Sequence, residues 1–222
     1  MARFQKRLHR ISVAARAARA AALATALAAA WATAVAAQDT PPPRLPDALT
    51  APAAVQPDAT PATRAQKLDA LFAQLATPDL AESAKVEADI QRLWGQSGSP
   101  AMDLLLRRAQ EAIAAEDLNA ALDHLNAAID HDPEFAEAWN TRASVFYQMN
   151  EYALAVNDIE HALALEPRHY GAMEGLAMIF SETQHPDLAL RVVEIARKVN
   201  PNRESLKEAE EGLQRELGAS DI

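Results

Sequence analysis

The sequence predicts an all-α protein built from a repeated helical unit. Its 222 residues include only 6 Gly and 5% aromatic residues, while 50% are hydrophobic, with alanine prominent among them. This composition favours helix, because alanine loses no side-chain entropy there, whereas sandwiches and barrels need β-branched and aromatic faces. Pro133, Pro167 and Pro201 follow one another at intervals of 34 residues. Self-similarity at such a period indicates stacked repeats.

Residues 1–37 have the pattern of a secretory signal peptide. They contain six basic residues and no acidic ones, then an apolar run of alanine and leucine, then small residues. We expect cleavage after Ala36 or Ala37, which would place the protein in the periplasm or outside the cell. The alternatives are a mitochondrial transit peptide and an uncleaved anchor. The anchor is disfavoured, because the run of about 18 residues is rich in weakly apolar alanine.

Charge and cysteine content exclude several classes of function. Loss of six positive charges with residues 1–37 would change the formal net charge from −10 to −16. So acidic a protein is expected to avoid nucleic acid and anionic lipid, and we expect no stable membrane insertion after cleavage. The chain has no cysteine, which excludes disulfides, thiolate zinc sites and cysteine nucleophiles.

Residues 38–62 are expected to be a disordered linker. They contain seven prolines, and proline removes backbone donors and fixes φ, so an extended spacer is favoured over a helix or strand. A proline-rich docking ligand is the alternative.

Residues 63–99 predict a pair of amphipathic helices. Thr63 and Gln66 fit a capping box, followed by an apolar face that runs from Leu68 to Leu75. The second helix is expected to start at Thr77-Pro78 and to align Val86, Ile90, Leu93 and Trp94. This pair is a candidate for a degenerate fourth repeat.

Three helix–turn–helix units are predicted at residues 102–135, 136–169 and 170–203. Several positions recur at the 34-residue spacing, namely Ala109/Ala143/Ala177, Ala121/Ala155/Ala189, Leu125/Ile159/Val193 and Ala128/Ala162/Ala196. Within the second unit, apolar residues recur every three or four positions on both sides of a polar turn at residues 148–151.

These residues resemble the tetratricopeptide repeat family, whose 34-residue unit favours W, L, G, Y, A, F, A and P at fixed places. The second unit matches with Trp139, Ala143, Phe146, Ala155, Ile159, Ala162 and Pro167. Alanine replaces the usual glycine in all three units, and arginine replaces leucine in two. The resemblance implies a helical solenoid, a right-handed superhelix. The arrangement of the whole chain also resembles exported tetratricopeptide proteins of alphaproteobacteria, which implies no particular activity.

Residues 204–222 predict a capping helix and tail. Asn202 is a candidate N-cap, and the apolar face comprises Leu206, Ala209, Leu213 and Leu217 with charge elsewhere. A stacked array needs such a polar-backed terminal helix.

Motifs for catalysis or cofactor binding are not evident. No glycine-rich phosphate loop, HExxH or GxSxG string occurs. His124 and His131 lie two helical turns apart, about 10 Å along the axis, which is too far for one tetrahedral metal ion. We therefore expect no enzyme, no cofactor and no metal site.

The family resemblance implies that ligands bind a concave groove lined by the first helix of each unit. The carried-over positions include Asp103, Leu106, Ile113, Ala114, Gly171 and Ser181, and the partner-binding residues we expect are Gln110, Glu137, Asn140, Ser144, Tyr147, Gln148, Glu174, Met178 and Glu182. Family members that bind chaperone C-terminal carboxylates use Lys, Asn and Arg there, whereas this groove is expected to hold four acids and no base.

The sequence thus predicts a noncatalytic exported adaptor that binds a protein or peptide, neutral to basic in charge. The alternative is a structural module in envelope assembly, a homo-oligomer that associates through an exposed N-terminal helix pair.

Overall fold

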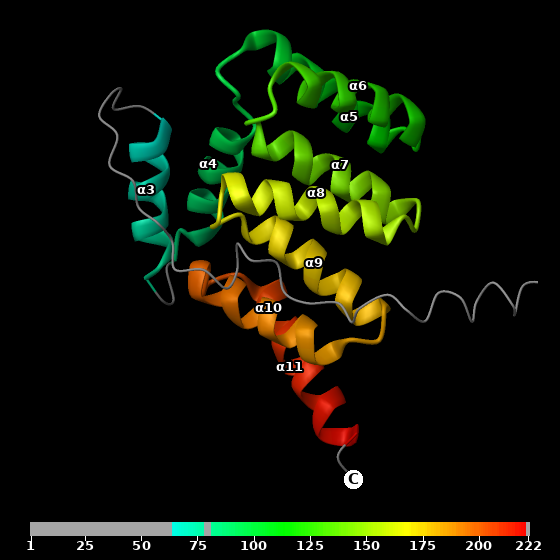
Figure 1. Ribbon diagram of the computed structural model, residues 1–222. Coiled ribbons are helices and arrows are strands. Elements are labelled where there is room, and N and C mark those ends of the chain that lie inside the picture. Colours follow the sequence, from blue (N-terminus) through cyan, green and yellow to red (C-terminus); the bar gives the residue numbers. More distant parts are fainter. Residues whose placement is uncertain (1–63, 78–80, 221–222) are drawn as a thin grey trace, which may run out of the picture. The chain divides into compact units, whose positions relative to one another are not determined.

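The computed structural model describes residues 64–77 and 81–220, which belong to one compact unit (Figure 1). Its helices are α3 (Arg64–Leu75), α4 (Ser83–Trp94), α5 (Pro100–Ala114), α6 (Leu118–His131), α7 (Ala136–Gln148), α8 (Tyr152–Leu165), α9 (Tyr170–Glu182), α10 (Pro186–Val199) and α11 (Glu204–Ser220). This part of the chain contains no strand, and none of its helices is long and apolar enough to cross a membrane. The predicted signal peptide, the linker and the cap at Thr63 lie outside the described residues.

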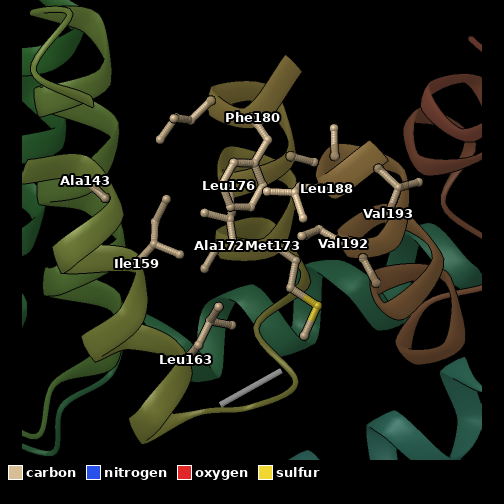
Figure 2. Packing of buried hydrophobic residues seen from close by; sticks show 14 of the residues in the cluster. Ala143, Ile159, Leu163, Ala172, Met173, Leu176, Phe180, Leu188, Val192 and Val193 are labelled. Carbon is tan, nitrogen blue, oxygen red and sulfur yellow. The ribbon is translucent and has the colours of Figure 1, made fainter. Parts of the chain in front are cut away.

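The three predicted units are three helical hairpins, α5 with α6, α7 with α8 and α9 with α10. Each hairpin packs on the next through α6 on α7 and α8 on α9, and α10 packs on α11. The alanines Ala121, Ala155 and Ala189 are all 0% exposed, because only a small side chain allows paired helices to approach this closely. In the third hairpin Met173, Leu176 and Val192 fill the space between the helices (Figure 2). The prediction of an all-α solenoid is confirmed.

The turn within each hairpin uses a residue with left-handed backbone geometry. Glu116, Asn150 and Gln184 have φ of 59°, 61° and 63°, again at the 34-residue spacing. The next residue then donates its backbone N–H to the carbonyl five positions earlier, as His185 does to Phe180 at 2.8 Å. This bond satisfies a carbonyl at the end of the first helix that would otherwise lack a partner.

The loops between units also share one hydrogen-bonding pattern. Asp132, Glu166 and Asn200 each end a helix directly before the periodic proline, with φ between −140° and −133° and ψ between 82° and 92°, outside the helical region that a following proline disfavours. The side chain of each accepts a hydrogen bond from the backbone N–H two residues later. The periodic prolines therefore mark a helix end in which the side chain before the proline fixes the turn.

An arginine that departs from the family pattern lies inside the second unit. Arg142 donates two hydrogen bonds to Asp158, from Nε at 2.7 Å and from Nη2 at 2.8 Å, and a third to Asn126. The Asp158 side chain is only 2% exposed. The equivalent positions of the third unit hold Leu176 and Val192, both 0% exposed. The ion pair of Arg142 and Asp158 in the second unit thus stands where the third unit has an apolar contact, and both residues differ between the two units.

The N-terminal helix pair does not stack as a fourth repeat. The buried side chains of α3 and α4, among them Phe72, Ile90 and Trp94, cluster with Tyr170 of α9 and not with the core of α5, α6 and α7. Asn202, expected as a cap for α11, donates its amide N–H to the carbonyls of Leu75 and Thr77 at the end of α3. The pair therefore lies against the loops that precede α9 and α11.

One further expectation needs correction, because helix α4 begins at Ser83 and not at Thr77-Pro78. Trp139, which matches the family pattern, is partly buried against the core and donates its indole N–H to the Pro133 carbonyl at 2.9 Å. At the other end, α11 buries Leu206 and Leu213 against α9 and α10, as a capping helix should.

Candidate partner-binding surface

Helix α4 reaches the first turn of α9, next to the predicted groove. The Trp94 ring stacks on His169 with centroids 4.0 Å apart and planes at 10°. The Nδ1 atom of His169 accepts the backbone N–H of Ala172, so the proton is on Nε2, which donates to Glu137 Oε2 at 2.8 Å. Glu137, a predicted partner contact, is therefore already engaged within the chain, and Asn140 donates to its other oxygen at 3.4 Å.

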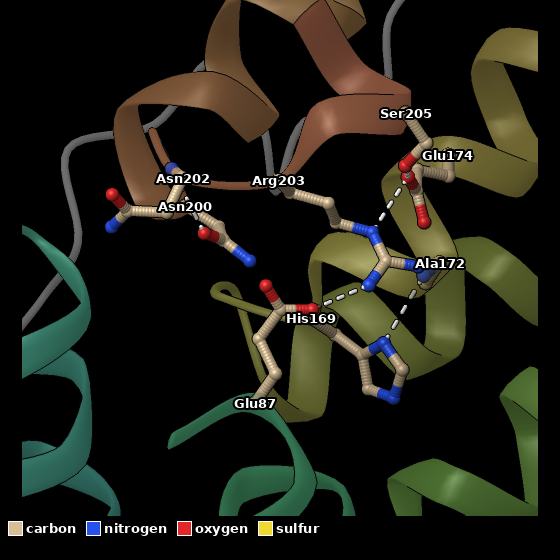
Figure 3. A network of polar contacts seen from close by, with 8 residues as sticks. All are labelled: Glu87, His169, Ala172, Glu174, Asn200, Asn202, Arg203 and Ser205. Carbon is tan, nitrogen blue, oxygen red and sulfur yellow. Dashed lines mark hydrogen bonds and ion pairs between the residues drawn. The ribbon is translucent and has the colours of Figure 1, made fainter. Parts of the chain in front are cut away.

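Arg203, which precedes α11, also joins α4 to α9. Its Nη1 donates to Glu87 of α4 at 2.6 Å and its Nε to Glu174 of α9 at 2.8 Å (Figure 3). Glu174 also accepts from the hydroxyl of Ser205 at 2.6 Å. The carried-over positions themselves hold four acids and no base, but Arg203, the last residue of the third unit, reaches the groove and pairs with Glu87 and Glu174.

A cavity of about 620 Å³ opens between α9, α10 and α11. Its wall combines apolar side chains with polar groups near Arg203, and the lining comprises Glu174, Ala177, Met178, Ser181, Val193, Arg203, Ser205, Leu206, Ala209, Gly212, Leu213 and Glu216. Met178 is 50% exposed, so a large apolar side chain stands at this cavity within reach of a partner. Three predicted groove positions, Glu174, Met178 and Ser181, are thus brought together.

The far end of α9 carries what we call the tyrosine-carboxylate cluster, Tyr147, Tyr152 and Glu182. The hydroxyl of Tyr147 donates to Glu182 Oε1, and that of Tyr152 to Oε2 at 2.6 Å. The Tyr147 bond lowers the pKa of Glu182, with a further contribution from Tyr152. The same bond, chiefly, raises the pKa of Tyr147 to about 12. Near neutral pH the cluster therefore holds an ionised carboxylate and two neutral hydroxyl donors.

Other predicted contacts are more scattered. Gln110 on α5 and Gln148 at the end of α7 are exposed, while Ser144 donates its hydroxyl to the Thr141 carbonyl of its own helix. Leu106, carried over as a groove position, is 3% exposed and belongs to the core. Asp103 accepts from the backbone and hydroxyl of Ser97, which fixes the loop before α5.

Sequence reasoning missed Tyr152 and Arg203. Tyr152 follows Tyr147 by five residues across the hairpin turn, and helical periodicity does not show which side chains a turn brings together. Arg203 occupies the position that Phe135 and His169 occupy in earlier units. This change from an apolar to a charged residue at a periodic position is the signal that could have found it.

Across residues 64–77 and 81–220 no group of three or more His, Asp or Glu side chains is placed to hold an ion. His161 packs edge-on against Trp139 at 4.3 Å.

Comparisons with known proteins agree with this geometry. A tetratricopeptide repeat family model matches residues 136–169, the range of the second unit. A TPR repeat-containing protein from Rhizobium etli is 39% identical over 132 residues, which cover 58% of this chain and 64% of that protein. The match thus spans less than two thirds of the relative's length.

Solved structures show the same fold at lower identity. The first TPR of Spaghetti (RPAP3), bound to the HSP90 peptide SRMEEVD, is 19% identical, with a TM-score of 0.52 over 54% of this chain and 95% of that one. The Sgt2 TPR domain from Aspergillus fumigatus gives the same identity and TM-score over 55% of this chain and 83% of that one. With the repeated hairpins, buried alanines and proline-marked loops described above, these structures show that the chain shares the fold of tetratricopeptide repeat domains, and its second unit matches the model of that family.

Proposed function

We propose that this protein is a noncatalytic adaptor that binds a protein or peptide segment on the surface formed by α7, α9 and α11. The observation that carries the proposal is the cavity of about 620 Å³ at Met178. It has the size typical of ligand pockets and an apolar wall with a few polar groups. Tetratricopeptide proteins are generally interaction modules, and a relative of the same fold was solved with a bound peptide.

The alternative of assembly through the N-terminal helix pair loses its structural basis. Leu68, Phe72 and Trp94 are 5%, 7% and 2% exposed, because the chain's own α9 and the loops before α9 and α11 cover them. Self-association through some other face stays an outcome of the test below.

Export to the periplasm is part of the proposal and rests on the pattern of residues 1–37 alone. The intact mass of the native protein tests it. A mass that lacks 36 or 37 residues supports export, and a soluble cytosolic species that retains them contradicts it.

Site-specific photocrosslinking in the native cells tests the binding surface. A benzophenone-bearing amino acid replaces Met178 in one variant and Leu154 of α8 in the control; the two native side chains are 50% and 48% exposed. We expect a discrete crosslinked product from position 178 that is absent at 154. Equal crosslinking at both positions would contradict the proposal. A product with twice the chain mass would favour self-association instead.

A further inference from the structure

The tyrosine-carboxylate cluster assembles from three different helices. Tyr147 lies at the end of α7, Tyr152 at the start of α8 and Glu182 at the end of α9. The two rings have centroids 5.9 Å apart and planes at 38°. Because the hydroxyls hold both carboxylate oxygens, the charge of Glu182 has a fixed direction and not the rotational freedom usual for an exposed glutamate.

The charge of Glu182 is not neutralised by any lysine, arginine or histidine of residues 64–77 and 81–220. The ion pairs of this part join other acids, for example Glu87 and Glu174 with Arg203. Those acids are half-buried, whereas Glu182 is exposed. Glu182 is therefore an exposed anion of fixed orientation beside the groove, and no cation of the described residues pairs with it.

A carboxylate in this state can accept further hydrogen bonds. Its two oxygens offer about four lone-pair sites, of which the tyrosines occupy one on each oxygen. The remaining sites suit the donors of an ammonium or guanidinium group. Tyrosine faces beside the carboxylate add attraction for the same cations.

The apolar cavity lies directly beside this cluster. Met178 and Ser181 line it, and Met178 precedes Glu182 by one helical turn, about 6 Å along the axis. That separation matches two residues of an extended segment or four residues of a helical one. A bound segment can therefore contact Glu182 and the cavity at the same time.

We infer that this surface recognises a peptide segment in which a lysine or arginine binds the tyrosine-carboxylate cluster while an apolar side chain two or four residues away enters the α9–α11 cavity. The inference rests on the proposed function and names the chemistry of its partner. Acidic segments are disfavoured, because the one basic side chain that lines the cavity, Arg203, already pairs with Glu87 and Glu174.

Selection from a random 12-residue display library on the full chain, followed by synthesis of the enriched peptides, tests the pairing. We expect enrichment of Lys or Arg at that spacing from Leu, Ile, Met or Phe. Glu182→Gln should raise the Kd of a selected peptide about tenfold. Replacement of the peptide's base by Gln should raise the Kd by a similar factor on the unmodified chain. On the Glu182→Gln variant the same replacement should change the Kd little, because both substitutions remove the same interaction.

Matched variants separate this interaction from general effects. Tyr147→Phe keeps the ring and removes one hydroxyl, so a smaller loss is expected. Glu160→Gln makes the same charge change at an exposed position of α8 and should leave the Kd unchanged. Unaltered thermal midpoints show that each variant is folded.

The outcomes distinguish this inference from the proposed function. If neutral or acidic peptides bind the chain and lose affinity for the Met178→Asp variant, the inference is overturned and the adaptor function still stands. The inference is also overturned if replacement of the peptide's base by Gln raises the Kd equally on the unmodified chain and on the Glu182→Gln variant. A library without enriched peptides, together with no crosslink from position 178, counts against both.

Discussion

Arg142 and Asp158 show how one unit can replace an apolar contact without loss of the fold. The two hydrogen bonds and the contact with Asn126 satisfy most of the guanidinium, and the chain changes both partners together in the third unit. A buried pair adds little net stability over an apolar pair of similar volume, but the loss of one partner leaves a buried charge.

Substitution at this pair gives the first prediction. Arg142→Leu should lower the free energy of unfolding by about 3–5 kcal/mol, because Asp158 is left buried without its cation. Arg142→Leu with Asp158→Val reproduces the Leu176 and Val192 pair of the third unit and should recover most of the loss. Urea midpoints measure both variants, and an equal loss in the single and the double variant would contradict the explanation.

The left-handed turn residues give a second prediction. Gln184 has φ of 63°, which costs a residue with a Cβ about 1–2 kcal/mol, whereas asparagine tolerates the region better. Gln184→Gly should therefore stabilise the protein by about 0.5–1 kcal/mol, and Asn150→Gly should change it less. Thermal midpoints compare the two. A larger gain at position 150 than at 184 would show that strain is not the cause.

At the scale of elements, the hairpins depend on helices that touch through alanine. Ala155 is 0% exposed between α7 and α8. Ala155→Leu should overpack this contact and cost about 1–3 kcal/mol. Denaturant midpoints check the value, with Ala153→Leu on the exposed face of α8 as the control. Wild-type midpoints in both variants would mean that the register is wrong.

The docking of α4 depends on Arg203. Arg203→Met removes the bonds to Glu87 and Glu174 and should cost about 1–3 kcal/mol, with faster amide hydrogen exchange in α4. Arg215→Met is a suitable control, because Arg215 is exposed and bonds only within α11. Exchange in α4 that both variants leave unchanged would show that the apolar contacts of Trp94 suffice.

Part of this arrangement could be predicted from the sequence, and the reason is periodicity. Positions such as Ala155 and Ile159 recur because each hairpin repeats the same local packing. The docking of α3 and α4 could not be predicted, since Arg168 meets Asp69 across 99 residues of sequence and no repeat encodes that contact. The positions that line the groove could be taken from the family pattern. Whether their side chains are free to bind a partner could not be predicted, because Glu137 and Glu174 contact residues of other elements.

At the scale of the whole molecule, buried side chains are distributed unevenly along the array. Helix α9 buries seven side chains, whereas α5 buries only Leu106 and Ala109. In solenoids stability is close to a sum of unit and neighbour terms. The first unit has fewer such terms, because the N-terminal helices lie against the far end of the array.

Hydrogen exchange of the native protein should reflect this difference. We expect amides of α5 and α6 to exchange faster than those of α9 and α10, because the first hairpin opens without the rest. Uniform protection across the four helices would indicate one cooperative unit.

The contacts of α3 and α4 also have a consequence for synthesis on the ribosome. Their apolar side chains pack with Tyr170 and Val199, and Val199 lies 105 positions beyond Trp94. At about 5–20 residues per second, translation of that interval takes about 5–20 s. During this time Phe72, Ile90 and Trp94 stay uncovered on the nascent chain while the hairpins that follow can already fold. These two helices, the first of the described residues to be translated, are thus among the last to reach their native contacts.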